Sequence, residues 1–439
     1  MNREVLRLAI PNILSNLSIP LLSSVDTALV GHLNGVHYIG AIAVGGAILN
    51  MVYWGFSFLR MGTTGPTAQA HGSQDREEEA SQFGRAICVA LFFGVLLILL
   101  QDLVFWAGLS IMKASPLVEK HARIYLSIRI YAAPATLSLL VMHGWFLGMQ
   151  NARFPLYLAL TSNAFNIGLN LYFVKVMGMK SDGIALGTLI AQYTALSVGV
   201  GLIVLRYRPT LRHLKFENII KWSALQKLFS INRDIFLRTL ALIFVFTYFT
   251  AQSAQFGDAF LAANAVLQQF WLLTAYGIDG FSDAAESLVG KYLGAKRIEK
   301  IQVAIKYVFA WGFALAFVLM LVFGLGKMHL LSLFTDQPKV LEIANTYFIW
   351  TLFVPLLSCL AFLWDGVYLG ATRTDLLRNT MFIAAFVVFY PLFRLTYPYL
   401  GNHALWLAMT AFMVTRGIAL SLLATKHFFG ARPLSLPAR

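Results

Sequence analysis

The stretch Gly144-Trp-Phe-Leu-Gly148 recurs as Gly366-Val-Tyr-Leu-Gly370, 222 residues further along the chain. Two other pairs match at the same offset: Gly40-Ala-Ile-Ala-Val44 with Ala262-Ala-Asn-Ala-Val266, and Gly72 with Gly294. Three separated matches at one shift indicate an internal repeat. The repeat therefore predicts that the chain consists of two halves built on one plan.

The composition identifies an integral membrane protein. Of 439 residues, 58% are hydrophobic and 12% are charged, whereas a soluble domain carries about 25% charged residues. Twelve apolar segments are long enough to cross a bilayer core, which needs about 20 residues each. They lie near 5–30, 38–62, 84–108, 122–147, 154–178, 183–205, 229–253, 259–284, 303–326, 341–369, 376–399 and 402–425.

The offset of the repeat spans six of these segments, an even number, so the two halves should point the same way through the membrane. This is a parallel repeat about an axis along the membrane normal. We therefore predict an all-α membrane protein with twelve transmembrane helices in two pseudo-symmetric six-helix bundles. The amino-terminal lobe should span residues 1–205 and the carboxy-terminal lobe residues 229–439.

The formal charge of +14 follows from topology and does not indicate a nucleic-acid partner. Most Lys and Arg residues fall in segments on the same side as the N-terminus, as the positive-inside rule requires of cytoplasmic loops. Both termini should therefore be cytoplasmic, in a multi-pass protein of the bacterial inner membrane. The basic stretch 206–228 should form a cytoplasmic linker between the lobes, and anionic lipid headgroups should attract it.

Asp26 is the acid that most needs an explanation. It lies in the first apolar segment and is the only acidic residue between Glu4 and Asp75. A carboxylate inside a lipid-spanning helix costs roughly 2.5–3.5 kcal/mol, so such residues usually have a function. Pro11 and Pro20 each remove a backbone hydrogen bond from the same helix, which makes the helix kinked or bendable.

The fifth and sixth segments offer partners for this carboxylate. Asn163, Asn166 and Asn170 share one helical face, and Thr188 and Gln192 are spaced i, i+4. Amides and hydroxyls could hold Asp26 in either protonation state, and burial against hydrogen bonding would set its pKa. The alternative for these residues is ordinary hydrogen bonding between helices, worth about 0.6 kcal/mol per contact.

The second half has acids of its own. Asp365 occupies the repeat position of His143 and is kept as a secondary candidate. Asp279, Asp283 and Glu286 lie near the end of the eighth segment, where pairing with an arginine such as Arg238 is expected. The sequence does not decide whether these acids move charge.

Motifs for enzymatic chemistry are missing from the sequence. It contains no nucleotide-binding loop, no metal-spaced His/Cys cluster, no serine nucleophile elbow and no dinucleotide fingerprint. The protein is therefore not expected to be an enzyme, to hydrolyse ATP, or to hold a metal or a cofactor. The energy for transport would come from an ion gradient.

Several stretches together carry a resemblance to a known family. They are Pro20-Leu-Leu-Ser-Ser-Val-Asp-Thr-Ala-Leu-Val-Gly-His-Leu33, Leu59-Arg-Met-Gly-Thr-Thr-Gly65, Asn232-Arg-Asp-Ile-Phe-Leu-Arg238, Ala275-Tyr-Gly-Ile-Asp-Gly-Phe281 and Asp365-Gly-Val-Tyr-Leu-Gly-Ala-Thr-Arg373. Over essentially its whole length the chain resembles the multidrug and toxic compound extrusion (MATE) transporters, in particular their DinF branch.

The resemblance implies two six-helix lobes with a cavity between helices 1, 2, 5 and 6. It also implies export of small amphipathic, often cationic, drug-like compounds in exchange for H⁺ or Na⁺. In DinF-like members the first-helix aspartate titrates, which corresponds to Asp26 here, and an early proline matches Pro11. Some relatives have Asn and then Asp on the fifth helix, whereas this chain has Asn166 and Asn170.

The missing second acid favours H⁺ over Na⁺ as the coupling ion, because a lone carboxylate can be protonated without a cage of negative ligands. The working hypothesis is a monomeric, proton-coupled multidrug exporter that works by alternating access in contact with membrane lipid. Three alternatives stay open: Na⁺ coupling at the same site, a flippase for lipids or lipid-linked sugars, and a metabolite or toxin importer.

Overall fold

The computed structural model describes the backbone of residues 1–31, 36–112 and 114–429. It describes the side chains of residues 1–18, 37–112 and 114–429. Within these ranges the chain is almost entirely helical and has no strands. The predicted all-α class is therefore confirmed.

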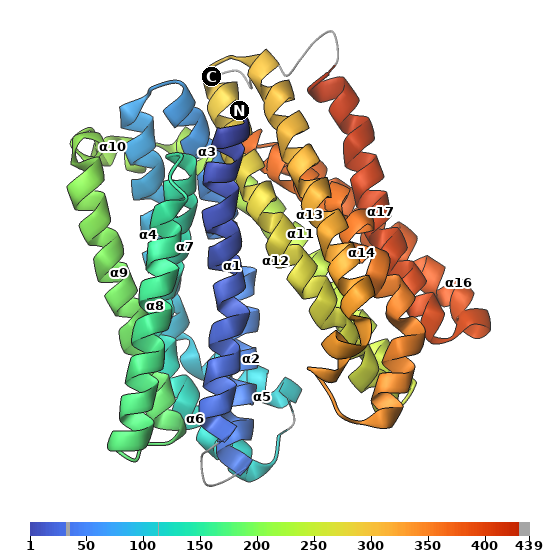
Figure 1. Cartoon of the computed structure of the whole chain (residues 1–439). Coiled ribbons are helices and arrows are strands. Elements are labelled where there is room, and N and C mark those ends of the chain that lie inside the picture. The colour runs from blue at the N-terminus through green and yellow to red at the C-terminus, as the bar shows by residue number, and fades with distance from the viewer. Residues whose placement is uncertain (32–35, 113, 430–439) are drawn as a thin grey trace. The chain divides into compact units, whose positions relative to one another are not determined.

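The first half of the chain forms six helical rods, of which several are broken by short kinks (Figure 1). They are α1 (Asn2–Gly31), α2 (Val36–Gly55) with α3 (Phe58–Gly72), α4 (Arg76–Leu99) with α5 (Gln101–Met112), α6 (Pro116–Arg129) with η1 (Ile130–Ala132) and α7 (Ala133–Gly148), α8 (Arg153–Leu171) with η2 (Tyr172–Val176), and α9 (Ser181–Leu211). The short helix α10 (Phe216–Ile219) follows them.

The second half repeats this plan with another six rods. They are α11 (Trp222–Gln255), α12 (Asp258–Gly294), α13 (Ile298–Ser332), α14 (Pro338–Gly370), α15 (Thr374–Phe382) with η3 (Ile383–Phe389) and α16 (Tyr390–Leu400), and α17 (Asn402–His427). Among the described residues, nine of the twelve rods meet both length and apolarity requirements for a membrane span. The other three are α1, α8 with η2, and α12. Helix α8 carries Asn163, Asn166 and Asn170, and α12 carries Asp279, Asp283 and Glu286.

The helices group into two compact units. One comprises residues 14–229, and the other comprises residues 1–13 together with 230–439. Helix α1 contributes to both units, because its first thirteen residues group with the second half of the chain. The helices α9 and α11 also extend into the ends of the predicted linker 206–228, so its non-helical part is short. The lobe boundaries stay a prediction.

Four turns show the repeat at atomic detail. Gln74, Gln150, Lys296 and Thr372 have φ angles of 60°, 62°, 56° and 56°, a left-handed conformation that is uncommon for residues with a side chain. Each follows a helix that ends in glycine, and each N–H donates to the carbonyl three residues back. The next residue's N–H reaches five residues back, which completes a Schellman motif. Lys296 and Thr372 lie at the offset of 222 from Gln74 and Gln150.

Glycines let paired helices approach closely in the same way in both halves. A Cβ added at Gly144 of α7 would collide with the carbonyl oxygen of Arg60 on α3. A Cβ at Gly366 of α14 would collide with that of Ser282 on α12, which lies 222 residues after Arg60. Small residues at helix contacts allow this close backbone approach in a membrane. The repeated stretches 144–148 and 366–370 therefore serve the same purpose: their glycines allow two helices to pack closely.

Candidate functional site

A cavity of about 660 Å³ lies within the unit formed by residues 14–229. Its walls come from α1, α2, α6, α7, α8 and α9, and they combine aliphatic side chains with polar ones. The volume lies within the range of about 300–1,000 Å³ that is typical of small-molecule sites. The space can therefore hold a drug-sized compound within one unit.

Three of the predicted site residues form a hydrogen-bonded chain. The Asn170 amide donates to Asn166 Oδ1 at 3.0 Å, and the Asn166 amide donates to Thr188 Oγ1 at 2.8 Å. The Thr188 hydroxyl in turn donates to the Ile184 carbonyl at 2.9 Å. All three side chains are buried. The structure thus brings together residues of α8 and α9 that are separated by a π-helical turn and a loop.

The cavity wall contains part of this chain. Thr188, Asn163 and Gln192 line the cavity, whereas Asn166 and Asn170 are not among its lining residues. Asn163 also donates to the Ser18 carbonyl of α1 at 3.4 Å, a long hydrogen bond that joins α8 to the first helix. The predicted polar face of the fifth helix therefore serves two purposes: it lines the cavity and it contacts α1 and α9.

Asp26 and Pro20 belong to the helical part of α1, but their side chains lie outside the described residues. Pro11 is described, and it lies in the first thirteen residues of α1, which group with the second half of the chain. Ser15, Asn16 and Ser18 of the same helix line the cavity. The polar side of α1 therefore faces an internal space within the unit of residues 14–229, as expected of polar residues in a membrane helix.

Two further residues with basic side chains line the cavity, Arg129 of α6 and His143 of α7. The Arg129 Nε donates to the Tyr125 hydroxyl at 3.2 Å, and its guanidinium lies 5.9 Å from the centre of the Tyr125 ring. Arg129 falls within the predicted membrane segment 122–147. Arg129 and Tyr125 are spaced i, i+4, and this spacing in the sequence could have predicted their contact. Among the lining residues that are described, none is acidic.

Asp365 lies in a buried ion cluster in the other unit. Its Oδ2 contacts Arg238 of α11 and accepts from Arg416 Nη2 of α17 at 2.6 Å. All three side chains are buried. Asp365 thus binds Arg238, a pairing that the sequence did not predict. Two guanidinium groups contact this carboxylate, so Asp365 belongs to a buried ion cluster.

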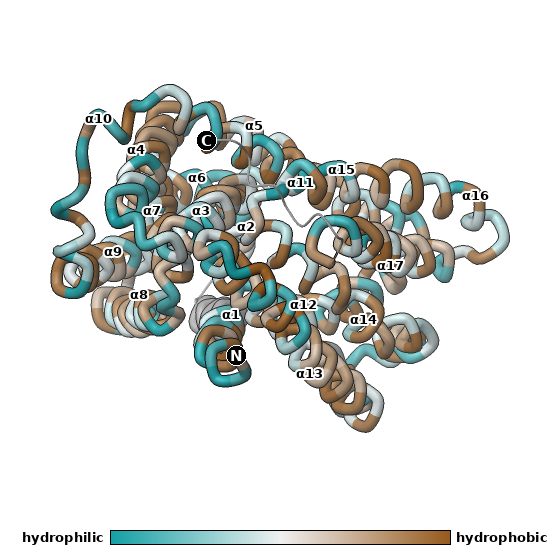
Figure 2. The backbone as a smooth tube through the Cα atoms, turned by 90° about the horizontal axis from the view of Figure 1, so that it is seen from above, coloured by the Kyte–Doolittle hydropathy of each residue, from teal (hydrophilic) through white to brown (hydrophobic). Residues whose placement is uncertain are grey.

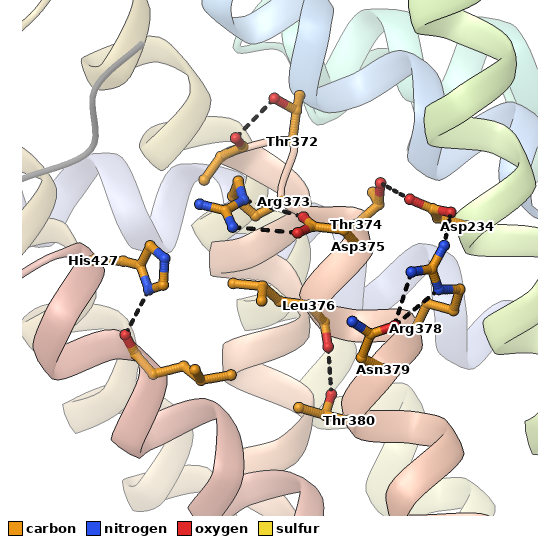
Figure 3. A network of polar contacts seen from close by, with 12 residues as sticks. Asp234, Thr372, Arg373, Thr374, Asp375, Leu376, Arg378, Asn379, Thr380 and His427 are labelled. Atoms are coloured by element: carbon orange, nitrogen blue, oxygen red, sulfur yellow. Dashed lines mark hydrogen bonds and ion pairs between the residues drawn. The ribbon is translucent and has the colours of Figure 1, made fainter. Parts of the chain in front are cut away.

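A second polar network of this unit lies between α11 and α15 (Figure 3). Asp234 is buried, and it accepts from Arg378 at 2.6 Å and from Thr374 at 3.5 Å. Arg373 forms two hydrogen bonds with Asp375, at 3.1 and 3.2 Å. The figure shows these side chains turned toward one another. They hold the start of α15 against α11, and this network is a structural one.

The described residues contain no group of three or more His, Cys, Asp or Glu side chains that could hold a metal ion. Cys88 is exposed and Cys359 is buried, and neither forms a disulfide. An internal cavity in a bundle of membrane helices is the arrangement of a transporter. Comparisons with known proteins agree with this class.

The family model MatE matches residues 11–172 and 235–393. Among curated proteins, the chain is 36% identical to DNA damage-inducible protein F of Escherichia coli over 97% of this chain and 93% of that protein. It is 23% identical to the probable multidrug resistance protein NorM of Neisseria meningitidis, over 95% and 92% of the two chains. The MATE transporter VcmN of Vibrio cholerae, in its bent form, has the same fold, with a TM-score of 0.88 at 19% identity over 97% and 96% of the chains.

The chain therefore belongs to the MatE family of transporters. The predicted family and its DinF branch are confirmed, and so is the expectation that the protein is not an enzyme. The twelve-helix, two-bundle fold of these transporters is the fold of this chain.

Proposed function

We propose that this protein exports small amphipathic, cationic compounds from the cytoplasm in exchange for protons, with Asp26 as the coupling residue. The protein would act as a monomer in the bacterial inner membrane, with both termini in the cytoplasm. Lobes of residues 1–205 and 229–439, joined by the linker 206–228, would alternate between two orientations. The names of two relatives, which describe multidrug resistance and detoxification, support the substrate class.

The observation that carries the proposal is the hydrogen-bonded chain from Asn170 through Asn166 to Thr188 at the wall of the cavity. Helix geometry relates this chain to Asp26. Helices α1 and α8 run in the same direction (Figure 1), and Asn163 contacts Ser18. At 1.5 Å per residue, Asp26 lies about 12 Å beyond Ser18 along α1, and Asn170 lies about 10 Å beyond Asn163 along α8. The two positions are therefore at about the same depth.

A proton suits this site better than a sodium ion. The proposed neighbours of Asp26 are the amides of Asn166 and Asn170 and the hydroxyl of Thr188. A second acid would occupy the position of Asn170, where this chain has an amide. Protonation of a single carboxylate removes its charge and turns an acceptor into a donor. The hydrogen bonds around it must then rearrange, which gives the two protonation states different stabilities in the two conformations.

In this mechanism, Asp26 takes up a proton from the outer side while the transporter is open outward. Helix α1 then bends near Pro11 or Pro20, where backbone hydrogen bonds are missing. Bending reduces the cavity between α1 and α8 and expels the compound. Return to the inward-open state releases the proton into the cytoplasm.

The test is transport in proteoliposomes with proton and sodium gradients imposed separately, for the native protein and for Asp26→Asn. The matched control is Asp102→Asn, the same change at an exposed residue of α5 outside the cavity lining. We expect proton-driven export by the native protein and the control, and none by Asp26→Asn. All three proteins should have the same elution profile in detergent.

Full proton-driven export by Asp26→Asn would refute the assigned role of this residue. If export requires a sodium gradient at constant pH, the coupling ion is Na⁺. The assignment of Asp26 as the coupling residue would still hold. Binding of the compound to the purified protein, measured without any gradient, separates loss of coupling from loss of the substrate site.

A further inference from the structure

The stretch from the last turns of α9 to the first turns of α11 carries a set of basic side chains that form no ion pair with the described residues. Five exposed residues between positions 206 and 227 form no ion pair with any described residue: Arg206, Arg208, Arg212, Lys221 and Lys227. Glu217 is the only acid between positions 206 and 229. Like charges gathered in this way repel one another, so an external anion would stabilise them.

Large apolar side chains alternate with these cations. Phe216 is 72% exposed and Trp222 is 68% exposed, and Ile220 between them is 57% exposed. Along the tube of Figure 2, hydrophilic and hydrophobic residues lie next to one another around α10. Aromatic residues beside Lys and Arg are typical of the interface between a bilayer and water.

The depth of these residues in the membrane follows from the length of α9. Its 31 residues extend about 46 Å, while the hydrocarbon core is about 30 Å thick and the bilayer with its headgroups about 40–45 Å. The last turns of α9, which carry Arg206 and Arg208, therefore stand at headgroup level. Residues 212–222 follow at the same surface.

Contacts with α4 fix the segment in place. Arg85 is buried and donates to the Asn218 carbonyl at 2.8 Å, and Asn218 in turn contacts Glu77. Lys215 pairs with Glu77 at 3.1 Å. Ile219 packs against Gly84, where a Cβ would approach its side chain to 3.0 Å. One side of α10 is thus attached to the bundle, which leaves Phe216 and Ile220 exposed beside the unpaired cations.

We propose that this surface, the linker patch of residues 206–227, binds the headgroups of anionic phospholipids. The cations supply the charge complementarity, and Phe216, Ile220 and Trp222 insert at the level of the upper acyl chains. Attachment to α4 orders the patch before a lipid binds, which lowers the entropic cost of binding. The proposal concerns lipid binding alone and does not depend on which ion drives transport.

The experiment uses the full-length protein in nanodiscs of phosphatidylcholine with increasing amounts of phosphatidylglycerol. An environment-sensitive fluorophore is attached at Phe216→Cys in a Cys88→Ser background, because Cys359 is buried and will not react. The patch variant is Arg208→Gln/Arg212→Gln/Lys221→Gln/Lys227→Gln. The control variant, Arg3→Gln/Arg7→Gln/Lys296→Gln/Lys306→Gln, removes the same charge from exposed residues elsewhere.

In this labelled set, the native protein is the Phe216→Cys/Cys88→Ser protein that keeps all its basic residues. We expect its emission to shift to the blue as phosphatidylglycerol increases. The control variant should respond like the native protein. Each basic residue near an anionic surface strengthens binding by about fivefold, so the response of the patch variant should be nearly lost. High salt should remove the response of the native protein as well, because it screens exposed charges.

Emission of the native protein that does not change with phosphatidylglycerol would overturn the proposal. So would an equal loss of response in the control and patch variants, which would indicate general electrostatics. If the patch variant does not fold, the salt dependence of the native protein still tests whether charge attracts the linker patch to anionic lipid. A failure here leaves the proton-coupling test untouched, because that test measures transport by Asp26→Asn.

Discussion

At the scale of single residues, Thr188 connects the cavity to the amide chain behind it. Its hydroxyl accepts from Asn166 and donates to the Ile184 carbonyl, and its side chain lines the cavity. A change in the cavity that displaces Thr188 would therefore also disturb its hydrogen bond with Asn166. The other residue of interest at this scale is Asp365, where one carboxylate contacts two guanidinium groups.

Replacing Thr188 by Val keeps the shape of the side chain and removes both hydrogen bonds of the hydroxyl. We expect Thr188→Val to lose most proton-driven export, because Asn166 loses its acceptor. Thr188→Ser keeps the hydroxyl and should retain export. Since hydrogen bonds between membrane helices contribute about 0.6 kcal/mol on average, thermal unfolding in detergent should change little in either variant. Equal export by the two variants would contradict a role for the hydroxyl.

Replacing Asp365 by Asn removes the charge that both Arg238 and Arg416 contact. Breaking a buried ion pair by removing one partner typically costs about 3–5 kcal/mol. We therefore expect Asp365→Asn to lower the thermal unfolding temperature far more than Asp102→Asn does. A stable Asp365→Asn protein that has lost proton coupling would instead make Asp365 a coupling residue.

At the scale of helices, the repeated glycines decide which helices can touch. Gly144 brings α7 onto the backbone of α3, and Gly366 brings α14 onto that of α12. The same contact therefore forms twice. Dispersion between closely packed backbones supplies much of the association of helices in lipid, where apolar surface alone gives no preference.

Gly366→Ala places a methyl group against the Ser282 carbonyl, so α12 and α14 must move apart. We expect a lower yield of folded protein and a lower unfolding temperature. The control is Gly201→Ala in α9, where an added Cβ meets no atom within 4 Å. This change should be neutral or stabilising by up to about 1 kcal/mol, because Ala favours the helix. If both variants unfold alike, close approach at Gly366 is not what holds the pair.

At the scale of the whole molecule, the start of α1 is attached to the second half of the chain. Glu4 lies before the first apolar run, and it contacts Lys291 at 3.4 Å and the Tyr292 hydroxyl at 3.1 Å, both on α12. Partial burial opposes ionisation of Glu4, but the Lys291 charge and the hydrogen bonds from Tyr292 and Lys291 hold its pKa below the ordinary value. The ionised form of Glu4 is therefore the form that the folded protein prefers.

A carboxyl whose pKa is depressed by folding stabilises the protein above its ordinary pKa and loses this effect as the pH falls through the folded value. We expect Glu4→Gln to unfold at a lower temperature than the native protein at neutral pH. The difference should shrink as the pH falls below the ordinary glutamate pKa and disappear below the depressed pKa of the folded protein. Because the Glu4 side chain is 32% exposed to water, solvent screening should keep the effect small. A difference that grows in acid would contradict this account.

The sequence by itself determined the number of helices, the parallel repeat and the face of α8 that carries its asparagines. These properties depend on local hydrophobicity, on helical periodicity and on glycines at turns, and each can be read along a short stretch. The predicted neighbours Asn166, Asn170 and Thr188 could also be found this way, because α8 and α9 are consecutive helices. The same reasoning identified Asp26, whose role stays a prediction.

Only the tertiary structure decided which distant residues meet. Arg238, Asp365 and Arg416 come from three helices separated by 127 and 51 residues along the chain, and the sequence offered several acids for each arginine. The attachment of Lys215 and Asn218 to α4 is of the same kind. Hydropathy places a helix in the membrane but does not choose its neighbours, because lipid and apolar side chains solvate it almost equally. Close backbone approach and the pairing of buried charges make that choice.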